Sequence, residues 1–318
     1  MNKRISVATV FFLMLLAIFF ACNRNPPSNT IRAGYLPIAD NLQLFVGVEK
    51  GFFKEEGVNV ELHSIPSGPK VLEAVFSRGS EGIDIGFSSI VPILLAKAQD
   101  LPIVIVAGGP VETTQHKTHA ILVGTESPIR SGADLAGKTI AVNALKNIEP
   151  VMLNRYLEKV GVDPKTINLT EVPFPQMESV LLSKNVDAVS AIEPYVTSAL
   201  QHGKVRVIDY QYVIVQPRTV VSSYVTSSSW LDNNRDVASR FVRAIQRATD
   251  FIRTNEPEAR NILMKYSKID QATANAMVLP EFEAQHSTED VQKWADQILK
   301  QGLINKPLDT SSIYQKLN

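Results

Sequence analysis

The feature that most constrains this chain is an alternation, from residue 31 onward, between short β-branched or apolar runs and longer amphipathic runs. Short apolar runs are typical of buried strands and amphipathic runs of surface helices, so the alternation predicts repeated βα units and largely parallel sheets. An all-β or all-α body does not fit this pattern. We therefore expect an α/β fold.

The alternation occurs twice, in the same order and over similar distances. In the first half, we expect strands at 31–36, 58–63, 83–87 and 103–107 and helices at 42–53, 70–78 and 90–98. In the second half, we expect strands at 139–142, 168–172 and 188–192 and helices at 149–160, 176–183 and 195–202. The match between the halves indicates either an internal duplication or only the repeated use of βα units, which recur in many folds.

The last third of the chain contains extended and helical patterns without a chemical motif. Segments 205–208 and 219–225 are extended and lead back toward the first half, and 236–255 and 289–301 are amphipathic helices. Because apolar stripes at helical spacing usually face a core, we interpret these two helices as packing elements.

Length and composition limit the function classes. At about 100 to 200 residues per domain, 318 residues suggest two domains. Lys plus Arg (32) balances Asp plus Glu (32), which makes a nucleic-acid partner improbable. Cys22 is the only cysteine, which excludes an internal disulfide and a multi-cysteine metal cluster.

The amino terminus has the pattern of an export signal. Lys3 and Arg4 precede the uncharged run 5–21, which ends directly before Cys22 and is followed by a polar stretch at 23–30. Ala21-Cys22 resembles a bacterial lipobox, in which the cysteine is acylated and becomes the first residue, although Phe19 stands where that pattern usually has Leu. The alternatives are an uncleaved anchor helix, for which the run is at the short limit, and ordinary signal-peptidase cleavage.

We therefore expect a signal peptide at 1–21 and a lipidated tether at 22–30. Each buried CH₂ of an acyl chain contributes about 0.8 kcal/mol, so two or more chains would hold the body at a membrane surface. No second run of this kind follows, and we expect the rest of the protein to be soluble.

Four segments together resemble the substrate-binding lipoproteins of bacterial ABC importers, in the nitrate, taurine, aliphatic sulfonate and thiamine-pyrimidine-precursor group. They are Gly34-Tyr-Leu-Pro-Ile-Ala-Asp-Asn, Lys50-Gly-Phe-Phe-Lys-Glu-Glu-Gly, Asp134-Leu-Ala-Gly-Lys-Thr-Ile-Ala-Val-Asn and Val186-Asp-Ala-Val-Ser-Ala-Ile-Glu-Pro. Their order and spacing, together with the lipobox, carry the resemblance.

The resemblance implies a two-lobed fold of the periplasmic binding protein type, with two hinge crossings. Lobe one would comprise 31–123 and 217–318, and lobe two 124–216. A small polar organic solute, sulfonate-like, taurine-like or pyrimidine-precursor-like, would be captured as the lobes close, without a cofactor, and delivered by a monomer to a membrane permease. To shift the lobes from 1:99 to 99:1 closed, the solute must favour the closed state by about 5.5 kcal/mol and so must contact both lobes.

Ligands of such sheets bind beyond the carboxyl ends of the strands, and this rule selects the candidate cleft residues. In lobe one they are Pro37, Asp40, Asn41, Ser67, Gly68, Ser88 and Ser89. Each has a structural alternative: Asn41 as a helix N-cap, Ser67 and Gly68 as an ordinary turn, and the two serines at 88 and 89 as caps.

In lobe two the corresponding candidates are Asn143, Lys146, Asn147, Phe174, Gln176, Glu193 and Tyr195. Lys146 would pair with a ligand anion or be a solvated surface charge. Phe174 would cover an apolar part of the solute or belong to a core. Glu193 would face the cleft or cap the following helix, where negative charge is favourable.

Asp40 and Glu193, if both line the cleft, argue against a bare inorganic anion, because like charges repel. A solute with donor or cationic groups fits better. His116 and His119 have His-x-x-His spacing, but no third ligand stands on a regular element, so we interpret them as structural or surface residues and expect no metal.

The rival hypothesis is an enzyme on the same fold, of the menaquinone or pyrimidine precursor synthesis type, because fold alone does not decide function. The cysteine-rich motif of the pyrimidine-forming enzymes is missing, as are Gly-x-Ser-x-Gly, phosphate-loop and His-Glu-x-x-His motifs. A third possibility is an exported scaffold that binds no small molecule. We favour the receptor.

Overall fold

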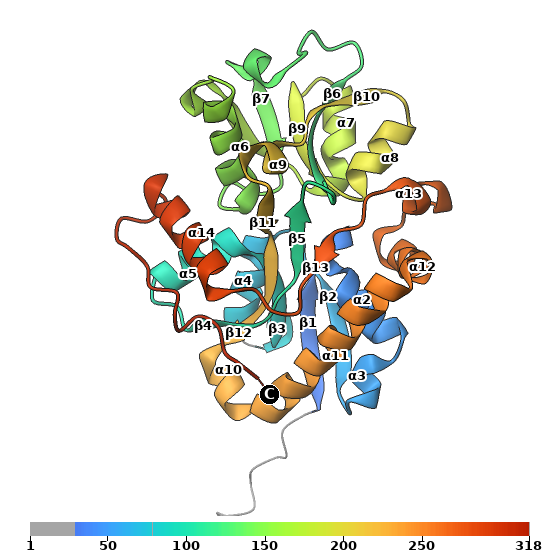
Figure 1. The fold of residues 1–318 in the computed structure, drawn as a ribbon, viewed down its shortest axis with the longest axis vertical. Helices are drawn as coiled ribbons and strands as arrows, with labels where there is room; N and C mark the ends of the chain where they lie inside the picture. Colours follow the sequence, from blue (N-terminus) through green and yellow to red (C-terminus); the bar gives the residue numbers. More distant parts are fainter. Residues whose placement is uncertain (1–28, 78, 318) are drawn as a thin grey trace, which may run out of the picture.

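The computed structural model describes residues 29–77 and 79–317 and divides them into two lobes that lie one above the other in Figure 1. The predicted signal peptide at 1–21 and Cys22 lie outside the described residues. Among the described residues, no helix combines the length and the apolar character that crossing a bilayer requires.

The first lobe is built on a five-stranded sheet. Its order is β2 (Asn59–Ser64), β1 (Thr30–Tyr35), β3 (Ile85–Ser89), β12 (Ser222–Ser227) and β4 (Ile103–Ala107). β1 is parallel to β2 and β3, whereas β12 is antiparallel to both β3 and β4. Only β12 therefore runs against the common direction.

The second lobe repeats this arrangement. Its sheet has the order β8 (Asn168–Glu171), β7 (Thr139–Val142), β9 (Ala188–Ile192), β6 (His119–Gly124) and β10 (Val205–Asp209). β7 is parallel to β8 and β9, and β6 is the reversed strand. The predicted α/β class, with mostly parallel sheets and the same order in both halves, is confirmed, although the strand β6 was not predicted.

Two chain segments cross between the lobes as paired strands. β5 (Pro110–Thr113) and β11 (Arg218–Val220) are antiparallel, and β13 (Glu281–Phe282) pairs with the other side of β5. β5 leads to β6 in the second sheet, and β11 leads back to β12 in the first. The pairing of β6 puts residues 119–123 in the second sheet, whereas the predicted boundary assigned them to lobe one.

Helices flank both sheets. The first lobe has α2 (Leu42–Glu49), α3 (Phe52–Glu55), α4 (Gly68–Phe76), α5 (Ile90–Ala98), α10 (Ser228–Asn233), α11 (Arg235–Thr254), α12 (Glu256–Ser267), α13 (Gln271–Ala276) and α14 (Thr288–Lys300). The second has α6 (Ile148–Lys159), α7 (Met177–Leu182), α8 (Tyr195–Gln201) and α9 (Gln211–Val215). Single 3-10 turns are η1 (Ala39–Asn41), η2 (Gly79–Glu81), η3 (Gly132–Leu135), η4 (Pro164–Thr166) and η5 (Phe174–Gln176).

The helix expected at 42–53 is interrupted at Gly51. This residue has φ of 74°, a left-handed conformation that ends α2 and starts the separate turn α3.

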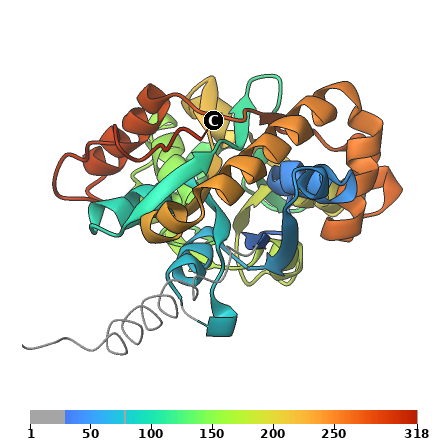
Figure 2. The same cartoon turned by 90° about the horizontal axis from the view of Figure 1, so that it is seen from below.

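Helix α11 holds the outer layer of the first lobe to its sheet. Its buried residues Val237, Phe241, Ile245, Ala248 and Ile252 recur every three or four positions, so they share one face. Figure 2 shows α11 lying across the lobe beside α2. The interpretation of this amphipathic segment as a packing element is confirmed.

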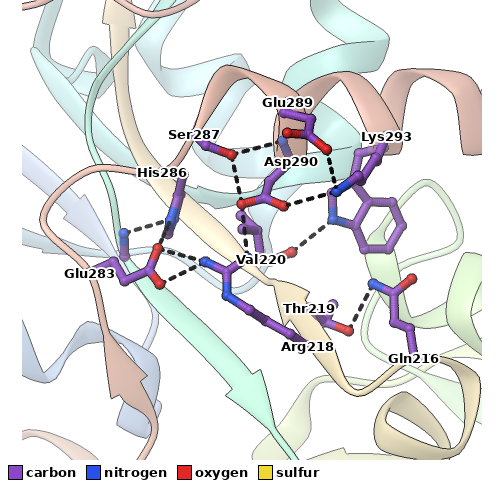
Figure 3. A network of polar contacts seen from close by, with 12 residues as sticks. Gln216, Arg218, Thr219, Val220, Glu283, His286, Ser287, Glu289, Asp290 and Lys293 are labelled. Carbon is purple, nitrogen blue, oxygen red and sulfur yellow. Dashed lines mark hydrogen bonds and ion pairs between the residues drawn. The ribbon is translucent and has the colours of Figure 1, made fainter.

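A polar network fastens the hinge strand β11 to the carboxyl-terminal part of the chain (Figure 3). Arg218 donates to both oxygens of Glu283, at 2.6 and 2.8 Å, and to Asp290 in α14 at 2.8 Å. The indole Nε1 of Trp294 donates to the carbonyl of Val220 at 2.9 Å. The hydrogen bond from His286, with Arg218 adding to it, lowers the pKa of Glu283. The helix α14 thus braces the crossing strand.

We expect the replacement Arg218→Gln to lower the free energy of unfolding by about 1 kcal/mol, because a partly exposed network loses its central cation. The melting temperature should fall by about 2 to 4 °C. The control is Arg253→Gln, which removes a more exposed pair with Asp250. Equal losses in the two variants would contradict the bracing role.

Candidate functional site

The carboxyl ends of the two sheets face each other and are joined by direct hydrogen bonds between the lobes. The hydroxyl of Tyr195 donates to the carbonyl of Pro37 at 3.1 Å, and the Asn143 amide donates to the carbonyl of Pro66 at 3.2 Å. The predicted loops of both halves therefore meet.

Another interlobe contact joins two predicted residues, since Ser89 donates to the side-chain oxygen of Asn147. The same oxygen accepts the backbone N–H of Ile148 at 2.9 Å, as an N-cap of α6. Gly68 lies beside this contact, where an added Cβ would come within 2.8 Å of the Ser88 hydroxyl. A side chain at this position would crowd Ser88 of the same lobe, so glycine leaves room beside the interlobe contact.

A buried ion pair lies where the hinge enters the second lobe. His119, at the start of β6, donates from Nδ1 to Glu112 of β5 at 2.5 Å, and Thr118 donates to the same carboxylate oxygen at 2.9 Å. The imidazole is stacked on the ring of Tyr212, with 4.0 Å between centroids and 7° between planes. Burial alone would lower the pKa of His119, but the carboxyl groups of Glu112, Asp40 and Glu149 together outweigh burial and raise the pKa.

Two more buried carboxyls interact with this pair, one from each lobe. Asp40 belongs to η1 and Glu149 to the first turn of α6, and both act electrostatically on His119. Burial, with further repulsion from Glu112 and Glu149, raises the pKa of Asp40 to about 7 although His119 opposes the shift. Burial likewise raises the pKa of Glu149. We call Asp40, Glu112, His119, Glu149 and Tyr212 the cleft cluster.

The cleft cluster and its neighbours carry buried polar atoms that have no hydrogen-bond partner. Among the described residues these include Oδ1 of Asp40, both side-chain polar atoms of Asn41, Oγ of Ser88, Oε1 of Glu112, Nε2 of His119, Oδ1 of Asn143, Oε2 of Glu149, Oε1 of Gln211 and the hydroxyl of Tyr212. Buried polar groups are normally paired, so this concentration makes the region the candidate site for a polar ligand.

Some of the predicted site residues belong to this group of unpaired buried atoms, and others do not. Asp40, Asn41, Ser88 and Asn143 each carry an unpaired buried atom there. The capping alternative does not apply to the side chains of Asn41 and Ser89, because neither of them makes a cap bond.

Other predicted residues lie elsewhere. Lys146 and Gln176 are exposed, so the structure does not bring them into the buried region. Glu193 accepts hydrogen bonds from the backbone and hydroxyl of Thr197 and caps α8. Phe174 and Tyr195 are stacked on each other and line a separate groove of about 370 Å³ beside α13.

Sequence reasoning missed most of the cleft cluster. Glu112 and Glu149 were detectable as carboxylates that interrupt apolar stretches, at a crossing segment and at a helix start. His119 was interpreted as structural or surface, and its partners were not foreseen. Tyr212 and Gln211 lie in a short helix that had no distinguishing pattern.

The two histidines of the His-x-x-His pair have different partners. Nδ1 of His116 contacts the carbonyl of Leu279 at 2.9 Å, away from the Glu112 carboxylate that holds His119. Within the described residues, no group of three His, Cys, Asp or Glu side chains has an arrangement suited to a metal ion.

The sequence and the fold of this chain are similar to those of known proteins. A family model described as "NMT1/THI5 like" matches residues 39–259. The formylaminopyrimidine-binding protein of Halalkalibacterium halodurans is 25% identical over 287 residues, which cover 85% of this chain and 81% of that protein.

A solved structure shows the same architecture. The alkanesulfonate-binding protein SsuA from Xanthomonas axonopodis pv. citri, bound to MOPS, superposes with a TM-score of 0.77 at 18% identity, over 92% of this chain and 99% of that one. At this identity the likeness concerns the fold alone, and it confirms the predicted two-lobed form.

An enzyme is also among the relatives. The 4-amino-5-hydroxymethyl-2-methylpyrimidine phosphate synthase of Aspergillus parasiticus is 25% identical over 217 residues, 66% of this chain and 62% of that protein.

We expect His119→Gln to destabilise the protein by about 3 kcal/mol, because it leaves the buried Glu112 carboxylate without its cationic partner. Urea unfolding at pH 7 measures this loss. The double variant Glu112→Gln with His119→Gln should lose less, since neither residue then carries a buried charge.

The matched control is His202→Gln, which breaks an exposed pair with Glu178. It should change the free energy of unfolding by less than about 0.5 kcal/mol. If His202→Gln lowered the free energy of unfolding as much as His119→Gln, the buried pair would not stabilise the protein more than an exposed pair does.

Proposed function

The chain belongs to the NMT1/THI5-like family, and from this premise we propose that it is the extracytoplasmic solute-binding protein of an ABC importer. In this role the two lobes close on a small polar organic solute and deliver it to a membrane permease. The relatives whose names are given as binding proteins support the role, as does the two-lobed architecture.

The observation that carries the proposal is the convergence of unpaired buried polar atoms from both lobes and the hinge. Asp40 and Ser88 come from the first lobe, Asn143 and Glu149 from the second, and Glu112 from the crossing strand. A solute that satisfies these atoms contacts both lobes at once and so favours the closed arrangement over the open one.

The chemistry of these atoms favours a solute that carries N–H groups. Acceptor oxygens predominate, and three of them belong to carboxyl groups. A sulfonate or nitrate would bring further negative charge to them. Of the two solute classes expected from the sequence, the pyrimidine-precursor type therefore fits better, and the name of the Halalkalibacterium relative describes a ligand of that type.

The synthase relative keeps the enzyme alternative open to test. We favour binding over catalysis because the cysteine-rich motif of the pyrimidine-forming enzymes is missing from this sequence. An enzyme of that type would release a product distinct from the compound it was given, whereas a receptor returns its solute unchanged.

We further propose that the protein acts at the cell envelope as a monomer held by acyl chains on Cys22. The run 5–21 would serve as the export signal, and the segment 22–30 as a tether between the membrane and the lobes.

The direct test of function is mass spectrometry of small molecules released from the purified protein by denaturation. We expect one polar organic solute with N–H groups, recovered chemically unchanged after it is bound again. Failure to find any solute, together with no compaction in solution scattering on addition of a metabolite extract, would contradict the proposal.

Replacing Ser88 and Asn143 together by Ala should lower the affinity for the solute about tenfold. Both side chains have an unpaired buried atom in the cleft, and a lost hydrogen bond to a ligand weakens binding by about 0.5 to 1.5 kcal/mol. The melting temperature should stay close to that of the wild type. The matched control is Ser183→Ala with Asn185→Ala on the exposed surface; equal binding in the two double variants would refute the cleft assignment.

For the anchor, we expect Cys22→Ala to move the protein from the membrane fraction to the soluble fraction. Mass spectrometry of the wild-type amino terminus should find an acylated Cys22. An unmodified Cys22 with residues 1–21 still attached would favour the uncleaved anchor helix instead.

A further inference from the structure

We propose that the closed cleft selects an organic cation with several N–H donors, such as an amidinium or a protonated aminoheterocycle, and that the empty cleft takes up protons when it closes. This inference rests on the proposed solute-binding function and adds to it the charge of the solute and a dependence of closure on pH.

The first argument is the origin of the carboxyl groups. Asp40 comes from the first lobe, Glu149 from the second and Glu112 from the hinge strand, and each is at most 3% exposed. Opening the lobes would separate Asp40 from Glu149 and return them to water. Closing the lobes brings like charges together in a medium of low dielectric constant, which opposes closure unless positive charge is supplied.

The second argument is the balance of charge within the cleft. His119 is the one cationic side chain in the cleft cluster, and its Nδ1 is already bound to Glu112. Its titratable neighbours Tyr210, Tyr212, Tyr224 and Glu193 are acidic or neutral. Two cations act on these neighbours rather than on the cluster: Lys117 lies over the ring of Tyr210, and Arg260 acts on Glu193. With all three carboxyls ionised, one imidazolium leaves two negative charges uncompensated.

The third argument is the direction of the available hydrogen bonds. The side-chain amides of Asn143 and Gln211 donate hydrogen bonds within the protein. Asn143 donates to the carbonyl of Pro66, and Gln211 donates to the hydroxyl of Ser190. Their oxygens are left unpaired, as is one carboxyl oxygen each of Asp40, Glu112 and Glu149. A solute rich in N–H donors meets these five oxygens, whereas an oxyanion has no hydrogen to donate to them.

The sign of the pH dependence follows from these contacts. In the closed form burial raises the pKa of Asp40 to about 7 from its ordinary value of 3.8, and it also raises the pKa of Glu149. In the open form these carboxyls are exposed to water and ionise at their ordinary values. Closure of the empty protein is therefore favoured in acid and opposed above pH 7. A bound cation replaces the protons, so its affinity rises with pH.

The first test is solution scattering of the full-length protein, stripped of solute, at pH 5 and pH 8. We expect a smaller radius of gyration at pH 5. The variant Asp40→Asn with Glu149→Gln should be compact at both pH values, because the repulsion is gone. The control Glu126→Gln with Glu158→Gln removes the same charge from exposed positions and should behave as the wild type.

The second test compares two planar probes of similar shape and opposite charge, benzamidine and benzoate. Benzamidine should raise the melting temperature and bind about 90-fold more tightly at pH 8 than at pH 5, as expected if it displaces one proton from a carboxyl with a pKa of about 7. Benzoate should have no effect at pH 8. The variant Asp40→Asn with Glu149→Gln should lose the response to benzamidine.

The inference would be overturned if the wild type had the same radius of gyration at the two pH values. It would also be overturned if benzoate raised the melting temperature as much as benzamidine or more. These failures differ from a failure of the proposed function. An anionic co-purified solute that compacts the protein would refute the cation proposal and leave the receptor role intact, whereas the absence of any solute and of any compaction would refute both.

Discussion

The pairing of β5 with β11 is the constraint on which the rest of the structure depends. These short strands are where the chain leaves the first sheet and returns to it, and each continues into the reversed strand of a sheet, β6 or β12. Because both crossings lie side by side, the carboxyl ends of the two sheets are turned toward each other. The brace from Arg218 to Glu283 and Asp290 fixes this geometry from outside.

The hinge also supplies chemistry, because Glu112 stands on β5 itself. Its carboxylate holds His119 at the start of β6, so the buried pair spans the crossing and the second sheet. Asp40 and Glu149 join it only because the loops after β1 and β7 meet across the cleft. A site of this kind is destabilising when empty, since buried polar groups without partners cost free energy. That cost makes closure responsive to what enters the cleft.

Much of the fold could be predicted from the sequence because its βα units are locally encoded. The strands at 103–107, 139–142 and 188–192 have the predicted bounds, and the apolar face of the long helix at 235–254 follows from its spacing. The candidate site was predicted in part. The rule that ligands lie beyond strand ends selected Asp40, Ser88 and Asn143, each of which has a buried polar atom without a partner. It also selected Lys146 and Gln176, which are exposed, because the direction of a side chain in a loop depends on what packs around it.

The sequence by itself determined the α/β class, the doubling of the lobes and the loops that meet at the cleft, because periodicity and turn residues act over short distances along the chain. Only the tertiary structure decided which charges share the interior. Residues 40, 149 and 212 are far in sequence from one another and from the pair 112 and 119, and no local pattern relates them. Their electrostatic coupling exists because two crossing strands bring the lobes face to face, and it acts through space rather than along the chain.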